Sequence, residues 1–165
     1  MNMRRLLLVL SLTAACGTAV AQPPGQSYAT LPLLHTAVVG MWHLDTRIGP
    51  CANPAASHEF LALQTFHLGG TVTGGDTHPA SGQGVTQGVW SYDWRARRYA
   101  VHMQFPRFVN DVYDGLQDVY ITNIDVSLFG DNLTGDVLAH MRNVDDSVRV
   151  ELCGSVSGKR IHVDP

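Results

Sequence analysis

Apolar and polar residues alternate with a period of two along much of this chain. In RYAVHMQF, residues 98–105, every second residue is large and apolar, and NIDVSLF, residues 123–129, has the same spacing. This spacing is typical of β-strands that bury one face. No segment after residue 38 shows the apolar stripe of an amphipathic helix. The pattern therefore predicts an all-β domain.

Eight longer strands and one short terminal strand are predicted. Their ranges are 39–47, 58–67, 70–74, 85–93, 97–106, 117–128, 133–142, 147–156 and 159–163. Short turn sequences rich in glycine, asparagine and aspartate separate them, including Gly74-Gly75-Asp76, Asp114-Gly115 and Asp145-Asp146. Antiparallel strands in sequential order must protect their edges, and a sandwich or a closed up-and-down barrel achieves this.

The start of the first predicted strand favours the barrel. In VVGMWHLD, residues 38–45, Gly40 stands two residues before Trp42. This Gly-x-Trp resembles the signature of lipocalin-like (calycin) barrels, in which the tryptophan closes one end of the barrel. In that family a basic residue near the last strand lies across the tryptophan ring, and Lys159 and Arg160 stand at this position here. A cation–π contact would stabilise such an arrangement.

The resemblance covers almost all of residues 38–161. FLALQTFHLGGTVT, GVWSYD, QDVYITNIDVSLFGDNLTG and CGSVSGKRI are similar to segments of small secreted bacterial lipocalin-like proteins. The Thr-Asp-Tyr motif and the long C-terminal helix of larger lipocalins have no counterpart. The resemblance implies a single antiparallel up-and-down β-barrel of about eight strands over residues 38–165.

Residues 1–21 are typical of a secretory signal peptide. Two arginines precede an apolar run, and a small-residue site, Ala-Val-Ala, follows at 19–21. The run is too short to span a bilayer, so no membrane insertion is expected after cleavage. A periplasmic or secreted protein is predicted, with an N-terminal tether at 22–37. Cleavage before Cys16 with lipidation of that residue is the alternative.

The charge balance narrows the classes of partner. The chain has 11 basic and 14 acidic residues, and its net charge is −3. Removal of the leader takes two arginines with it and leaves a net charge of −5. No basic stripe remains, which argues against nucleic acid or an anionic membrane surface as a partner.

Two cysteines remain once the leader is removed, Cys51 and Cys153. In an exported chain they most simply form one disulfide, and two buried free thiols are the alternative. A closing barrel would bring the loop after the first strand alongside the last strand. We therefore predict that the bridge pins the seam of the barrel.

Eight histidines raise the question of a metal site. No His-x-His pair places two ligands on one face of a strand. A composite site of His67, His102 and His140 is conceivable, but histidines scattered over different strands are more simply solvated or hydrogen-bonded. No metal and no cofactor are therefore expected.

Catalytic residues are not identified by any motif. His102 and Asp125 are the candidates for an acid–base pair, since each lies on the polar face of a predicted strand. They could act only if those faces point into the barrel. Small barrels keep apolar side chains inside, so outward polar faces are favoured.

The barrel predicts a pocket for a small hydrophobic molecule. Its expected lining residues are Phe60, Phe66, Val101, Met103 and Phe105. A cofactor-free isomerase, cyclase or lyase acting inside the barrel is one alternative. Haem binding through an inward-facing histidine is another.

Overall fold

The computed structural model describes residues 33–79 and 81–163 of the chain. Among these residues it contains eight strands, two short 3-10 helices and no α-helix. The strands are β1 (Gly40–Pro50), β2 (His58–Phe66), β3 (Thr71–Asp76), β4 (Thr86–Asp93), β5 (Arg98–Val109), β6 (Val112–Val126), β7 (Asn132–Arg142) and β8 (Val148–Arg160). The 3-10 helices are η1 (Leu33–Thr36) and η2 (Pro54–Ala56).

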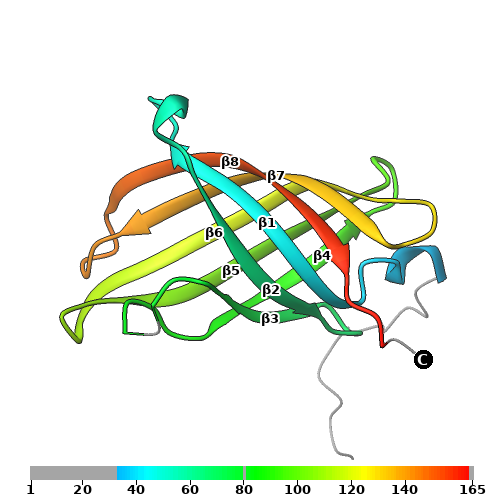
Figure 1. The fold of residues 1–165 in the computed structure, drawn as a ribbon, viewed down its shortest axis with the longest axis horizontal. Coiled ribbons are helices and arrows are strands. Elements are labelled where there is room, and N and C mark those ends of the chain that lie inside the picture. Colours follow the sequence, from blue (N-terminus) through cyan, green and yellow to red (C-terminus); the bar gives the residue numbers. More distant parts are fainter. Residues whose placement is uncertain (1–32, 80, 164–165) are drawn as a thin grey trace, which may run out of the picture. The chain divides into compact units, whose positions relative to one another are not determined.

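The eight strands form one closed antiparallel barrel (Figure 1). Each strand pairs with the next along the chain, and β8 pairs with β1. Closure leaves no unpaired edge strand, which is how an up-and-down barrel avoids edge-to-edge association. The predicted all-β barrel is confirmed, and the sandwich is excluded.

Two predicted turns are wrong. Gly74-Gly75-Asp76 forms the end of β3 and not a turn. Asp114-Gly115 lies inside β6, and the turn between β5 and β6 is formed by Asn110 and Asp111, with φ values of 51° and 63°. Asparagine and aspartate tolerate this left-handed conformation, which two-residue hairpin turns require. The predicted short strand 159–163 is also not separate, because β8 continues to Arg160.

The disulfide is present where the sequence predicted it. Cys51 directly follows β1 and is bonded to Cys153 of β8, with the two Cα atoms 4.8 Å apart. The register pairs Gly49 with Cys153 and Trp42 with Arg160. The bridge therefore crosses the β1–β8 seam at the end of the barrel opposite Trp42.

Trp42 closes the other end of the barrel. Its side chain is fully buried (0% exposed), and its Nε1 donates a hydrogen bond to the carbonyl oxygen of Val38 at 2.7 Å. The guanidinium of Arg160 covers the ring, with its carbon 4.4 Å from the ring centroid. Lys159, the other candidate, is exposed. The arrangement expected from the Gly-x-Trp resemblance is thus observed.

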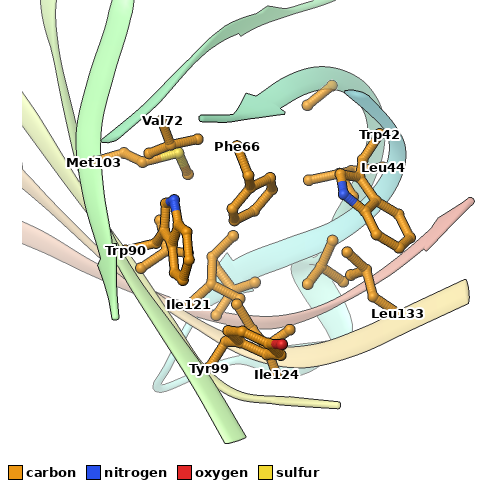
Figure 2. Close-up of a cluster of buried hydrophobic side chains, with 14 of the residues drawn as sticks. Trp42, Leu44, Phe66, Val72, Trp90, Tyr99, Met103, Ile121, Ile124 and Leu133 are labelled. Atoms are coloured by element: carbon orange, nitrogen blue, oxygen red, sulfur yellow. The ribbon is translucent and has the colours of Figure 1, made fainter. Parts of the chain in front are cut away.

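Aromatic and branched side chains fill the barrel interior around Trp42. We call this part of the barrel the closed end. Figure 2 shows Leu44, Phe66 and Tyr99 among the side chains of this cluster. They come from β1, β2 and β5, whose alternate residues face inward. The closed end is therefore packed solid, and any space for a ligand must lie further along the barrel.

The predicted signal peptide at 1–21 lies outside the described residues, as does most of the tether at 22–37. Only the end of the tether is described, and it contains η1. In the part of the chain that the structure covers, no helix has the length and apolar character needed to cross a membrane.

Candidate functional site

A cavity of about 290 Å³ lies inside the barrel. Every strand contributes at least one residue to its wall, and the segment between β3 and β4 contributes four more. It extends from Leu44 and Gln64, next to the closed end, to Arg107 and the β3–β4 segment. We call this latter side the open end. The volume is at the lower limit of the range of about 300–1,000 Å³ typical of small-molecule pockets.

Three of the five predicted lining residues face this cavity. Phe60 of β2 and both Met103 and Phe105 of β5 line it. Aliphatic side chains from β6, β7 and β8, including Val119 and Val137, complete the apolar wall. Such a lining favours an apolar ligand, because each 100 Å² of apolar surface removed from water contributes about 2.5 kcal/mol.

Phe66 and Val101 face inward but do not line the cavity. Phe66 pairs with Gly40 in the register and belongs to the closed-end cluster. Val101 is likewise buried in this cluster, opposite Trp90. Strand alternation predicts the inward direction of a side chain, but it does not predict how far along the barrel the packed region extends.

The cavity wall also contains polar groups that the sequence analysis did not identify. Arg107 of β5 is 9% exposed and lines the cavity near the open end. Its Nη2 donates to Oδ2 of Asp114, which also accepts a hydrogen bond from Arg149 at 2.8 Å. Its Nη1 is buried and has no hydrogen-bond partner among the described residues. A residue that lines the cavity thus retains one unmet donor.

Gln64 is a second unmet polar group in the cavity wall. It is buried on β2, next to the closed end, and its Oε1 has no hydrogen-bond partner among residues 33–79 and 81–163. The amide is packed closely against Gly74 of β3, where a Cβ would lie 2.2 Å from Oε1.

Asp76 and His78 form an acid–base pair beside the open end. Oδ1 of Asp76 lies 2.8 Å from Nδ1 of His78 and accepts a hydrogen bond from the His78 backbone N–H at 2.8 Å. It also accepts a bond from Nε2 of Gln83 at 2.9 Å. All three residues line the cavity. Several donors therefore contact this carboxylate. The guanidinium of Arg107, in contrast, retains a donor that has no acceptor.

The two catalytic candidates from the sequence lie outside the barrel and do not form a pair. His102 alternates with the inward Val101 and Met103, and its ring stacks on Tyr120 with centroids 4.4 Å apart. Asp125 is exposed and forms an ion pair with Arg98 at 3.2 Å. Neither lines the cavity. Since β5 is regular around His102, the strand's two-residue period places its side chain on the outer face.

A buried carboxylate organises the outer face near His102. Asp118 of β6 is only 2% exposed, and it accepts hydrogen bonds from Gln104 at 2.6 Å and from Arg142. His102 approaches the same carboxylate at 3.5 Å. Burial opposes ionisation of Asp118, but these hydrogen bonds outweigh that effect and lower its pKa. The cluster is a network within the barrel wall and does not open into the cavity.

The histidines considered for a metal site are not grouped. His67 contacts Thr73, and His140 lies beside Glu151 on the outer face. Within the described part of the chain, no three histidine, cysteine, aspartate or glutamate side chains are arranged to hold a metal ion.

Comparison with protein family models, with curated proteins and with solved structures found no match for this chain.

Arg107 could have been predicted from the sequence pattern. It continues the inward alternation of Val101, Met103 and Phe105 by one further step. A charged residue at an inward position of a barrel strand is a signal for a ligand-binding group. Asp76 and Gln83 had no such signal, because they stand in a glycine-rich segment whose path the sequence does not predict.

Proposed function

We propose that this chain is an exported, lipocalin-like protein that binds a small hydrophobic molecule inside its barrel. The observation that carries the proposal is the apolar cavity of about 290 Å³ enclosed by all eight strands. We assign ligand contacts to Phe60, Met103 and Phe105. Phe66 and Val101 are assigned to the packed floor beneath the ligand.

Export is supported by two independent features. The disulfide between Cys51 and Cys153 favours an oxidising compartment such as the periplasm or the cell exterior. The first 21 residues have the composition of a secretory signal peptide.

Native mass spectrometry of the purified chain tests the binding proposal. We expect a fraction of the protein to carry a co-purified small molecule, which gentle activation releases. Val119→Trp would fill the cavity and should abolish the adduct, whereas Val89→Trp, on the exposed outer face of β4, should retain it. An adduct that persists in Val119→Trp would place the ligand elsewhere.

A cofactor-free enzyme is the second candidate, and one observation favours it. The Asp76–His78 pair lies in the cavity wall with its nitrogen and oxygen 2.8 Å apart, so the carboxylate can orient His78 as an acid or base toward a bound molecule. If His78→Gln retains ligand binding but abolishes conversion of that ligand, the chain is an enzyme. If no conversion occurs in the wild type, the pair only fixes the β3–β4 segment.

A further inference from the structure

We propose that the ligand of this cavity carries an anionic head group, which the guanidinium of Arg107 binds near the open end while an apolar tail fills the barrel. This inference rests on the proposed function and names the chemical class of its ligand. Carboxylates, sulfates and phosphates share the required chemistry, which is an anionic oxygen that accepts a hydrogen bond.

The first observation is the unmet donor. Arg107 lines the cavity and is 9% exposed, so water solvates its guanidinium poorly. Its Nη1 is buried without a hydrogen-bond partner among the described residues. Folded proteins rarely leave a buried donor unpaired, and a charged one is especially unfavourable. An anionic oxygen in the cavity would complete this hydrogen bond.

The second observation is a surplus of positive charge. Asp114 is the carboxylate that both Arg107 and Arg149 contact. Arg149 directs both its Nη1 and its Nη2 at Asp114, at 3.3 and 2.8 Å. Two cations thus share one anion, and Arg107 is the one of the two that lines the cavity.

The pKa of Arg107 is consistent with this surplus. Burial lowers it, and the nearby positive charge of Arg149 lowers it further, while Asp114 acts in the opposite direction. A bound anion would oppose both lowering effects. A cationic head group would strengthen them, so the same site disfavours amines.

The other ionisable groups of the cavity do not compensate Arg107. Asp76 accepts hydrogen bonds from His78 and Gln83 through its Oδ1, so its charge already has donors. The His58 ring lies 6.2 Å from that of His78, and His78 contacts Asp76. Gln83 pairs with Arg107 in an isolated β-bridge, so this group lies beside Arg107. The donor left unmet is Nη1 of Arg107.

The volume sets the size of the ligand. If each heavy atom occupies the ~30 Å³ of a water molecule in the liquid, a cavity of about 290 Å³ holds roughly ten heavy atoms. Octanoate has this size. With its carboxylate at Arg107, its chain would extend past Phe105 and Met103 toward the closed end.

Titration calorimetry with matched ligands tests the inference. Octanoate, octyl sulfate and octan-1-ol share one tail, and only the alcohol is neutral. A hydrogen bond to a charged group predicts that the wild type binds an anionic ligand about 10–100-fold more tightly than octan-1-ol. The two anions show whether the site prefers a planar carboxylate or a tetrahedral head group.

Arg107→Met should remove this preference and leave octan-1-ol binding within about threefold. Asp114 keeps Arg149 as a partner in this variant, so no carboxylate is left unpaired. Arg98→Met is the matched control, because Arg98 is on the same strand but pairs with Asp125 on the outside. This control should keep the full preference.

The outcomes separate the inference from the proposed function. The anionic head group is overturned if the wild type binds all three ligands with equal affinity, or if the preference survives in Arg107→Met. Neither result contradicts the binding function. If none of the three ligands binds the wild type, the proposed function fails with it. If Arg107→Met does not fold, Arg107→Lys is used instead. Lysine lacks the planar fork of donors, so this variant should retain only part of the preference for the anion.

Discussion

The guanidinium carbon of Arg160 lies 4.4 Å from the centroid of the Trp42 ring, and the same group donates hydrogen bonds to the carbonyl oxygens of Ala37, Val39 and Gly130. Arg160 of β8 thus contacts the segment that leads into β1, the β6–β7 turn and the tryptophan that closes the barrel. The cavity depends on this closed end, because a packed floor keeps water out of one side.

Trp42→Ala should therefore destabilise the fold strongly. Removing a fully buried tryptophan leaves a void at the closed end, and we expect the free energy of unfolding to fall by about 3–5 kcal/mol. Urea unfolding followed by circular dichroism measures this change. Trp94→Ala, at an exposed site, is the control and should change stability by less than about 0.5 kcal/mol. A loss at Trp42 no larger than at Trp94 would show that the ring does not close the barrel.

Gly40→Ala should also weaken the closed end. Gly40 has a φ of 133°, and a Cβ there would lie 2.4 Å from Nη1 of Arg160. We expect a loss of about 1–3 kcal/mol, since backbone strain and the displaced guanidinium act together. Gly75→Ala is the matched control, because nothing lies within 4 Å of a Cβ at that position. Equal stability of the two variants in a thermal melt would contradict the close packing of Arg160.

The disulfide should contribute substantially to stability. Cys51 and Cys153 are 102 residues apart in the sequence, and closing a loop of that length contributes about 4.7 kcal/mol in the chain-entropy model. The double variant Cys51→Ala/Cys153→Ala should therefore unfold at much lower urea concentration than the wild type. Peptide mapping without reductant should recover the two cysteines in one linked fragment. Separate, alkylated peptides from the wild type would rule out the bridge.

Asp118 should make stability depend on pH in the acid range. Burial favours its protonated form, but hydrogen bonds from Arg142, Gln104 and His102 lower its pKa below the ordinary value of 3.8. A carboxyl group whose pKa is lower in the folded state stabilises the fold above its unfolded-state pKa. This contribution should disappear as the pH falls below about 4, through the folded-state pKa.

Urea unfolding of the wild type and Asp118→Asn between about pH 7 and pH 3 measures this effect. The variant should be less stable at neutral pH, and its stability should change less steeply in the acid range. Parallel curves for the two proteins would show that another group causes the acid sensitivity.

The sequence predicted the barrel better than it predicted the site. Alternation along β5 and the Gly-x-Trp of β1 are local patterns, so strand faces and the closed end could be predicted from them. Cys51 and Cys153 pair because closure brings the ends of β1 and β8 together, and the resemblance to a closed barrel already implied that closure.

The cavity residues depend on distances that no local pattern contains. Phe66 and Phe60 both belong to β2, yet only Phe60 lines the cavity, because the depth of the packed floor is set by side chains from several strands. The misplaced turn between β5 and β6 has a different cause. Asn110 and Asp111 form it because β5 and β6 extend further than the apolar pattern indicates.

Methyl NMR of methionine tests whether the barrel binds a small apolar molecule. Met103 and Met141 line the cavity, whereas Met41 is 43% exposed on the outer face of β1 and serves as an internal control. On titration of methyl-labelled protein with octanoate and with octan-1-ol, we expect saturable shifts of the Met103 and Met141 signals and an unchanged Met41 signal. If neither ligand shifts Met103 and Met141, or if Met41 alone responds, the cavity does not bind such molecules.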